Sequence, residues 1–294
     1  MIFIYNVIYI NMLINNIWII NLDKSVDRFE RIKKNMETLN LNFNRFSAVY
    51  GKNVSQEYLN DKVNPICKTL LCNYGTIGCA ASHKQLWTQL INSDQSAYII
   101  LEDDALVTQK SVDIINQLEP YIEKYNIDYL NLVCINYGCS LQKTEFKIGE
   151  YEFGKPYMPL QTCGYIITKT GAKKLLDIIN NTTYHVDFEI LYVKLMHDLN
   201  YYATTPRIID MFETPTTIGA KRTCLSIELL NNIGLSYIGW GINAPLLTVK
   251  LKYEINIITI LLLILLLINI YKIKNDIIYW FILLELFMLY SIYL

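Results

Sequence analysis

The sequence predicts an α/β fold, a Rossmann-type mixed sheet with helices on both faces. Short, unbroken runs of branched apolar residues, typical of buried strands, alternate with segments whose apolar residues recur at helical spacing. The expected strands lie at residues 17–20, 98–101, 129–134 and 165–168. The expected helices follow Ser25 and lie at residues 80–91, 112–124 and 171–179. This alternation favours a parallel or mixed sheet crossed by helices.

The first strand and helix form the first half of a βαβ unit. The run Ile17-Trp18-Ile19-Ile20 ends at Asn21, and Ser25 can cap the helix that follows. The apolar residues of that helix are Phe29, Ile32, Met36 and Leu39. In the helix over residues 80–91 the expected core residues are Leu86, Trp87 and Leu90. Each helix therefore has one apolar stripe that can pack on the sheet.

The composition excludes some classes of function. The 294 residues carry a formal net charge of −1, without a long run of Lys or Arg, so no nucleic-acid partner is expected. None of the seven cysteines is spaced as CxxC, which argues against a zinc knuckle. Their odd number argues against a fully paired framework and leaves one or two disulfides open.

The chain is expected to have three regions. Residues 1–16 carry no charge but are interrupted by asparagines, which argues against a signal peptide and favours an irregular extension, with a weak membrane anchor as the alternative. Residues 17–245 form the α/β domain that carries the chemistry. Residues 255–294 contain two apolar segments, 255–271 and 277–294, of which the first carries no charge and the second carries only Glu285.

Each C-terminal segment approaches the ~20 residues that a helix needs to cross a bilayer. C-terminal transmembrane helices and a membrane-anchored protein are therefore expected. An ionised Glu285 near mid-depth would cost at least ~2.5 kcal/mol, so this residue is expected to be neutral, to face the partner helix or to lie in a segment on the membrane surface. The lysines that flank residues 255–271 are balanced, so the side of the membrane is not assigned.

The acidic triplet Glu102-Asp103-Asp104 directly follows the expected strand at residues 98–101. Ligands of open α/β sheets bind beyond the carboxyl ends of the strands, which is where this triplet falls. Three adjacent carboxylates repel one another unless a cation lies among them, and oxygen ligands suit Mg²⁺ or Mn²⁺. A solvated acidic turn is the alternative.

Five segments of the sequence resemble those of one known family. They are Ile19-Ile20-Asn21-Leu22-Asp23 with Asp27-Arg28, Phe43-Asn44-Arg45-Phe46 with Ala48-Val49-Tyr50-Gly51, Gly78-Cys79-Ala80-Ala81-Ser82-His83, Ile100-Leu101-Glu102-Asp103-Asp104, and Gly164-Tyr165-Ile166-Ile167 with Gly171-Ala172-Lys173-Lys174-Leu175-Leu176. In order and spacing they resemble glycosyltransferase family 25, which includes bacterial lipooligosaccharide galactosyltransferases and procollagen galactosyltransferases. The resemblance runs over about residues 17–215.

The resemblance implies a GT-A fold and transfer of galactose or another hexose from a UDP-sugar, with inversion, to a hydroxyl of a glycan or protein acceptor. It also implies Mn²⁺ (or Mg²⁺) as cofactor. The triplet is similar to the family's DxD-type motif. Asp104 would then ligate the metal, with Glu102 near the ribose or a metal-bound water and Asp103 in the same motif. Asn21 would line the nucleotide pocket, and Arg28 would either reach the diphosphate or lie on a solvated helix face.

Two further pairs of residues match the family's pattern. Ser82 and His83 resemble its Ser-His pair and are expected to support the donor site, although a buried structural histidine is the alternative. Asp187 and Glu189 resemble its later Pro-x-Asp element, with His185 in place of proline. An inverting transfer needs a carboxylate that takes the proton of the acceptor hydroxyl, so Asp187 is the first candidate and Glu189 the second. Charges that favour a helix N-terminus are the alternative, and His185 could add a metal ligand.

Two other functions fit parts of the pattern. A catalytically inactive, membrane-tethered module that binds a nucleotide-sugar or glycan would keep the fold without turnover, although the intact triplet argues against it. A nucleotidyltransferase would be expected to show a Gly-rich phosphate loop or further paired aspartates, and the sequence shows neither. The sequence does not identify the acceptor.

Overall fold

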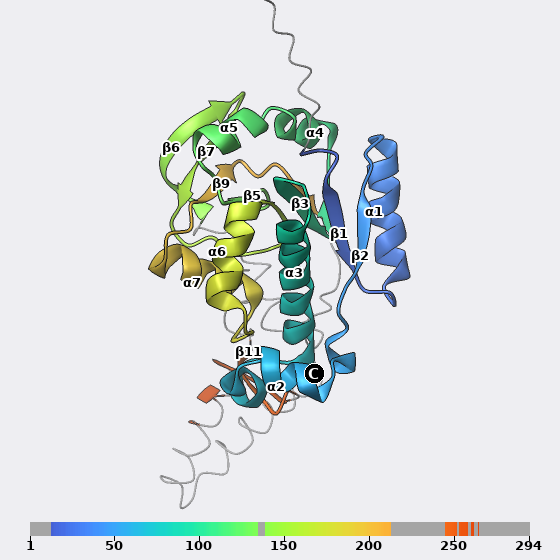
Figure 1. Cartoon of the computed structure of the whole chain (residues 1–294), viewed down its shortest axis with the longest axis vertical. Helices are drawn as coiled ribbons and strands as arrows, with labels where there is room; N and C mark the ends of the chain where they lie inside the picture. The colour runs from blue at the N-terminus through green and yellow to red at the C-terminus, as the bar shows by residue number, and fades with distance from the viewer. Residues whose placement is uncertain are drawn as a thin grey trace, which may run out of the picture. The chain divides into compact units, whose positions relative to one another are not determined.

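A computed structural model describes residues 13–134, 139–212, 245–251, 253–257, 260, 261 and 264. The chain divides into two compact units (Figure 1). The first unit comprises Met1–Val54 and Gly78–Thr214, and the second comprises Ser55–Ile77 and Pro215–Leu294.

The first unit is built on a mixed sheet of eight strands. In spatial order these are β2 (Asn44–Ser47), β1 (Ile17–Asn21), β3 (Ala97–Glu102), β8 (Gly164–Thr168), β5 (Tyr129–Asn131), β9 (Tyr201–Thr205), β7 (Tyr151–Pro156) and β6 (Leu141–Ile148). Strands β2, β1 and β3 are parallel. Strand β8 runs antiparallel to both of its neighbours, β3 and β5. A two-stranded ladder joins β4 (Ala105–Leu106) to β10 (Asp210–Met211).

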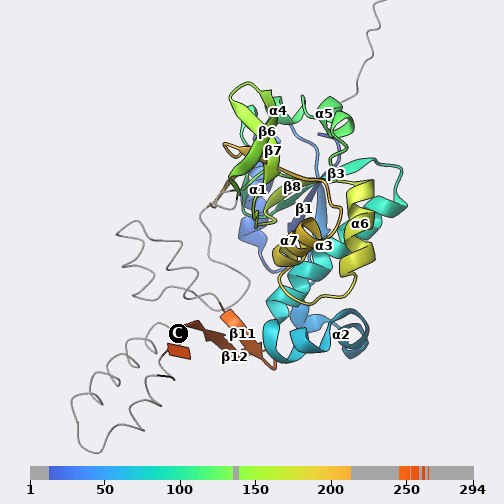
Figure 2. The same cartoon turned by 90° about the vertical axis from the view of Figure 1, so that its left-hand side faces the viewer.

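Helices cover both faces of this sheet, as expected. The helices are α1 (Val26–Thr38), α3 (Tyr74–Asn92), α4 (Gln109–Ile115), α5 (Glu119–Lys124), α6 (Lys169–Ile179) and α7 (Val186–Met196), with the short turn η1 (Gly51–Asn53). Figure 2 shows α1 and α3 on opposite sides of the strands. The mixed α/β sheet with helices on both faces confirms this part of the fold prediction.

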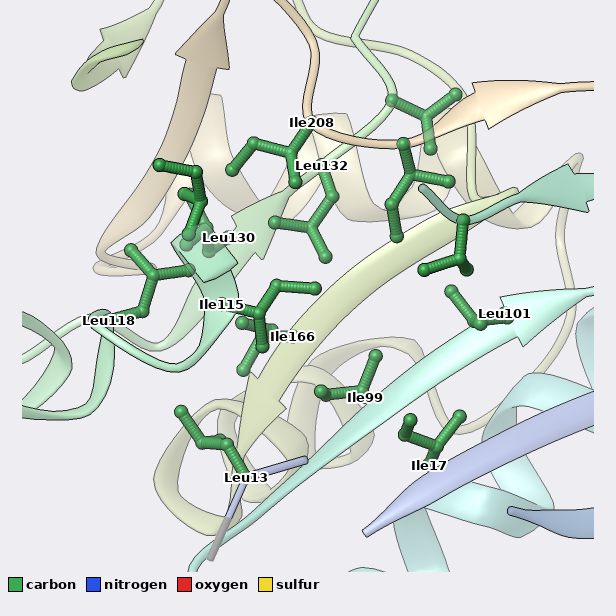
Figure 3. Close-up of a cluster of buried hydrophobic side chains, with 14 of the residues drawn as sticks. Leu13, Ile17, Ile99, Leu101, Ile115, Leu118, Leu130, Leu132, Ile166 and Ile208 are labelled. Atoms are coloured by element: carbon green, nitrogen blue, oxygen red, sulfur yellow. The ribbon is translucent and has the colours of Figure 1, made fainter. Parts of the chain in front are cut away.

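The side chains of β3 contribute to the apolar cores on both faces of the sheet. Ile99 and Leu101 point into a core with residues of α1, α4 and α5, part of which Figure 3 shows. Tyr98 and Ile100 point into a second core with residues of α3, α6 and α7. Since successive strand residues face opposite sides, a strand buried on both faces must be apolar throughout. This is why β3 is a continuous apolar run.

One expected helix, residues 112–124, is divided into α4 and α5. Helix α5 has Pro120 in its first turn, where the missing N–H of proline costs no helical hydrogen bond. Inside a continuous helix the same proline would remove a hydrogen bond and clash with the preceding turn. The chain therefore turns after Ile115 and begins a new helix at Glu119.

The second unit contains α2 (Gln56–Lys62), the short π-helical turn η2 (Cys67–Leu71) and the antiparallel pair β11 (Pro245–Val249) and β12 (Tyr253–Asn256). A disulfide joins Cys67 to Cys72 across η2. The backbone N–H of Lys250 donates to the carbonyl oxygen of Thr69 at 3.0 Å. The β11–β12 pair is therefore bonded to the segment that holds the disulfide.

The prediction of C-terminal membrane helices has to be corrected. In the described part of the chain, none of the helices combines the length and apolar character that crossing a bilayer requires. The expected segment 255–271 begins inside a strand, because β12 includes Ile255 and Asn256. The expected segment 277–294 lies outside the described residues. The predictions of transmembrane helices and of a membrane-anchored localisation are therefore wrong.

The expected N-terminal extension is described only from Leu13 onward. Leu13 is buried in the core with Ile17 and Ile99, and the side chain of Asn16 donates to Gln95 at 2.7 Å. The end of the extension thus packs on the first unit. The proposed domain boundaries stay a prediction.

Candidate active site

The candidate site lies where two parallel strands end. Asn21 is the last residue of β1 and Glu102 the last residue of β3, and Ile20 pairs with Glu102 across the two strands. Strand β8 is antiparallel, so the residues that precede it meet the same edge, and the N–H of Glu102 donates to the carbonyl oxygen of Cys163 at 2.8 Å. The triplet is therefore surrounded by the ends of three neighbouring strands.

Asp103 is held by two residues from the first strand and helix. It is buried, and its Oδ2 accepts a hydrogen bond from Asn21 Nδ2 at 2.7 Å. Its Oδ1 forms an ion pair with the Arg28 guanidinium. The Asn21 side chain also donates to the carbonyl oxygen of Ser25 and accepts from Arg45. Asn21 therefore positions Asp103 and ties the end of β1 to β2.

Asp104 contacts the same nitrogen of Arg28 as Asp103 does. Its Oδ2 lies 3.0 Å from Arg28 Nη2, and the Cys163 thiol donates to its Oδ1 at 3.1 Å. Burial, and then the charge of Glu102, raises the pKa of Asp104 above its ordinary value. The Arg28 side chain is only 16% exposed, so it lies against the two aspartates and not on a solvated helix face.

Glu102 turns toward β8 and α3. The Thr162 hydroxyl donates to its Oε1 at 2.7 Å, and His83 Nε2 lies 3.4 Å from the same oxygen. Burial would raise the pKa of Glu102, but contacts with His83 and Thr162 outweigh it and hold that pKa below its ordinary value. These contacts thus stabilise the ionised form of Glu102.

Ser82 and His83 have separate contacts. Ser82 Oγ accepts from the Val49 N–H at 2.8 Å and donates to the Gly78 carbonyl oxygen at 2.7 Å. A Cβ on Gly78 would lie 2.3 Å from the Val49 carbonyl oxygen, so glycine allows α3 to approach this segment closely. His83 is fully buried, and its Nδ1 lies 2.8 Å from the Tyr165 hydroxyl oxygen.

Asp187 lies in the first turn of α7, beside the triplet. Its Oδ2 accepts a hydrogen bond from the Gln161 N–H at 3.4 Å. Burial raises the pKa of Asp187 above its ordinary value, while His185 opposes this shift and Glu102 adds to it. The charge of Glu102 therefore acts on the Asp187 carboxylate.

Glu189 has a different environment. It is buried, and its Oε2 lies 2.8 Å from Lys84 Nζ of α3. Its Oε1 accepts from the backbone N–H groups of Thr183 and Tyr184 at 2.5 and 3.4 Å. The structure thus uses Glu189 to join α7 to α3 and to the loop before α7.

Four residues at this edge were not singled out from the sequence. Arg45 donates to Asn21 and pairs with Asp23 at 2.6 Å, while Thr162 and Cys163 donate to Glu102 and Asp104. Cys79 lies one helical turn before His83, and its sulfur, His83 and a Glu102 oxygen all lie within 4.8 Å of one another. The Cys79–His83 spacing is a sequence signal for this last group, whereas Thr162 and Cys163 are recognisable only once β8 is placed beside β3.

The fold and the site define an α/β protein with a polar, carboxylate-rich site at the carboxyl edge of a mixed sheet. Residues 14–190 match the family described as glycosyltransferase family 25 (LPS biosynthesis protein). The chain belongs to glycosyltransferase family 25. This confirms the resemblance seen in the sequence and the predicted class of enzyme, a glycosyltransferase.

Individual relatives share this region. A glycosyltransferase 25 family member of Anopheles gambiae is 26% identical over 181 residues, 55% of this chain and 28% of the relative. Procollagen galactosyltransferase 1-B of Xenopus laevis is 26% identical over 56% of this chain and 28% of its own length. Lipooligosaccharide biosynthesis protein lex-1 of Haemophilus influenzae is 23% identical over 65% of this chain and 74% of its own length. The first two matches thus span less than a third of the longer relatives.

Proposed function

We propose that this protein transfers a sugar, galactose or another hexose, from a UDP-sugar to a hydroxyl of a glycan or protein acceptor. The proposed reaction depends on a divalent metal and inverts the anomeric carbon. The observation that carries the proposal is the triplet Glu102–Asp104 at the carboxyl end of β3, inside the segment that matches the family. The donor sugar and the two kinds of acceptor are those that the relatives' names suggest.

The residues present fit a hard divalent cation such as Mn²⁺ or Mg²⁺. Asp104 and Glu102 offer carboxylate oxygens, the ligands that such ions prefer. Their side chains are 17% and 25% exposed, whereas Asp103 is 10% exposed and bonded to Asn21. The raised pKa of Asp104 also fits, because a cation would stabilise its ionised form. Bound there, the ion would offset the charge that develops on the departing diphosphate.

The chain's own residues supply the remaining roles. Arg28 carries a charge that can reach the diphosphate from a side chain already fixed by Asp103 and Asp104. Asn21 donates a hydrogen bond to Asp103. Ser82 of α3 accepts a hydrogen bond from the Val49 N–H and so keeps that segment against the helix. Both are positioning residues for the donor side of the site.

Asp187 is the proposed general base. Its raised pKa brings the carboxylate closer to the range in which a base works well near neutral pH. Glu189 is already paired with Lys84 and two backbone N–H groups. The geometry therefore favours Asp187 over Glu189 as the group that accepts the acceptor's proton.

A donor screen tests the proposal. The purified chain is incubated with several UDP-sugars and Mn²⁺, with and without candidate glycan and peptide acceptors, and UDP release is measured. UDP release that needs the metal and one preferred sugar supports the proposal, and the anomeric configuration of the product, read by NMR, tests inversion. Donor binding without UDP release would indicate a binding module, and pyrophosphate release would indicate a nucleotidyltransferase. Either result would reject the proposed reaction.

A further inference from the structure

Helix α3 presents two metal-ligand side chains on one face. Cys79 and His83 are four residues apart, so they lie one above the other along the helix. The end of β3 brings Glu102 to the same place, and the Cys79 sulfur, a His83 nitrogen and a Glu102 oxygen lie within 4.8 Å of one another. Two elements far apart in the chain thus converge on one small space.

The imidazole of His83 provides the second observation. His83 is fully buried, and its Nε2 makes no hydrogen bond of good geometry among the described residues but lies 3.4 Å from Glu102 Oε1. The other nitrogen, Nδ1, lies 2.8 Å from the Tyr165 hydroxyl oxygen, which also accepts from Trp87 Nε1 at 2.9 Å. Metal binding selects the tautomer in which Nδ1 carries the proton and donates it to Tyr165, because only then is the Nε2 lone pair free to bind an ion held between Nε2 and Glu102. An outer hydrogen bond of this kind is how proteins orient a metal-binding histidine.

We propose that Cys79, His83 and Glu102 form a binding site for Zn²⁺. Thiolate and imidazole ligands favour Zn²⁺ over Mg²⁺ or Mn²⁺, which prefer oxygen ligands alone. With Zn–S and Zn–N bonds of about 2.3 and 2.0 Å, tetrahedral ligand atoms lie about 3.3–3.6 Å apart. The separation of His83 Nε2 from Glu102 Oε1 is 3.4 Å, within that range. The thiol proton of Cys79 leaves to solvent as the ion binds.

The surroundings of the three residues also attract a cation. Burial, and then the charges of Glu102, Asp187 and Asp104, raise the pKa of the Cys79 thiol well above its ordinary value, and a bound cation would offset the effect of these three charges. Cys79 and Glu102 are each half-buried, whereas His83 is fully buried. A tetrahedral Zn²⁺ needs a fourth ligand, which a water molecule would have to supply here.

Cobalt substitution tests the site directly. The full chain, kept without thiol reductant so that the Cys67–Cys72 and Cys134–Cys139 disulfides stay closed, is freed of metal and titrated with Co²⁺. One Co²⁺ per chain should bind with thiolate-to-cobalt charge-transfer absorption and intense tetrahedral bands, and Zn²⁺ should remove both. Cys79→Ser should lose the charge-transfer absorption and weaken Zn²⁺ binding by more than about 100-fold, beyond the loss typical of an outer partner.

A matched control is Cys163→Ser, which removes the other free thiol of the described residues and should leave the cobalt spectrum unchanged. His83→Gln is a second ligand variant, and it should abolish the tetrahedral bands while leaving Cys79 in place. Circular dichroism confirms that each variant is folded. A wild-type spectrum without thiolate absorption overturns the proposal, and so does an unchanged spectrum in folded Cys79→Ser.

A consequence for turnover rests on the proposed function. Since Glu102 belongs to both the Zn²⁺ site and the proposed donor site, Zn²⁺ should inhibit Mn²⁺-dependent sugar transfer. Inhibition should need at least about tenfold more Zn²⁺ in Cys79→Ser, in keeping with its weaker binding. If no UDP-sugar is turned over, the proposed function fails, whereas the cobalt spectrum still decides whether the site exists.

Discussion

Asp103 and Asp104 are neighbours in sequence but have different partners. Asp103 is buried and bonded to Asn21 and Arg28, so Asp103→Asn removes a charge on which the fold depends. We expect it to lower the free energy of unfolding by about 1–3 kcal/mol. Asp104 has a raised pKa, which means that its ionised form is disfavoured in the folded state. The free energy of unfolding of Asp104→Asn should therefore equal or exceed that of the wild type.

The two variants should also differ in activity, and here Asp104→Asn should show the loss. Asp104→Asn is expected to abolish Mn²⁺-dependent turnover because it removes the proposed metal ligand. Urea unfolding and a Mn²⁺ titration of UDP release on both variants measure the two effects. Full activity in folded Asp104→Asn would reject this ligand assignment.

The raised pKa of Asp187 predicts how activity depends on pH. A general base must be ionised, so kcat/KM should fall as the pH drops through this pKa. Because burial raises the pKa, the fall should begin at a higher pH than for an ordinary aspartate. Asp187→Asn should reduce kcat by about 10²–10⁴-fold, the usual contribution of a general base.

The measurement is a pH profile of UDP release, with Glu189→Gln as the matched control from the same helical turn. Glu189→Gln should keep the acid limb at the same pH even if it lowers stability. Loss of the acid limb in Glu189→Gln, with retention in Asp187→Asn, would assign the base to Glu189.

At the residue scale, the triplet and its neighbours were partly predictable. Glu102, Asp103 and Asp104 could be placed at a strand end because an apolar run directly precedes them. The partners of Glu102 and Asp104 could not be predicted, because Thr162 and Cys163 reach them through the antiparallel β3–β8 pairing. Local periodicity carries no information about which distant strands pair.

The contact between α3 and α7 depends on a buried ion pair. Burial lowers the pKa of Lys84 and raises the pKa of Glu189, in each case against the pull of the partner's charge. Lys84→Met would leave the buried Glu189 carboxylate without its lysine partner. We expect this to lower the free energy of unfolding by about 3–5 kcal/mol. The double variant Lys84→Met/Glu189→Gln should recover part of this loss.

A double-mutant cycle on the unfolding free energy measures this coupling. Glu189→Gln alone is the third corner of the cycle, and Lys173→Met on α6, whose side chain is 67% exposed, is the control for loss of a lysine. Additive effects at Lys84 and Glu189 would show that the pair is not coupled in the folded state.

At the element scale, strands and helices with strong patterns were predicted and irregular ones were not. The expected core residues Leu86, Trp87 and Leu90 are fully buried in α3. The break between α4 and α5 follows from Pro120, which an apolar periodicity does not register. The β6–β7 hairpin was also missed, although Gly149 begins a two-residue loop between the strands and has φ +58°. A glycine at the first position of a two-residue loop is a recognised hairpin signal.

At the scale of the whole molecule, the apolar C-terminal region misled the prediction of membrane helices. A continuous apolar run can belong to a helix or to a strand, and composition alone does not separate the two. Ile255 illustrates the ambiguity, since it lies in β12 and pairs with Leu247 of β11. Pairing within this β-hairpin, which the apolar composition does not reveal, decides the structure at this position.

The division into two units predicts which part of the chain donor binding should protect from hydrogen exchange. The proposed site residues all lie in the first unit: Glu102, Asp103, Asp104, Arg28, Asn21 and Asp187. UDP and Mn²⁺ at 100 times their dissociation constant should stabilise the folded state by about 2.7 kcal/mol. Hydrogen exchange should therefore slow at the ends of β1 and β3 and around Cys163, with a smaller change in β11 and β12. Asp104→Asn is the control and should lose this protection, whereas protection concentrated in residues 245–257 would place the donor site in the second unit.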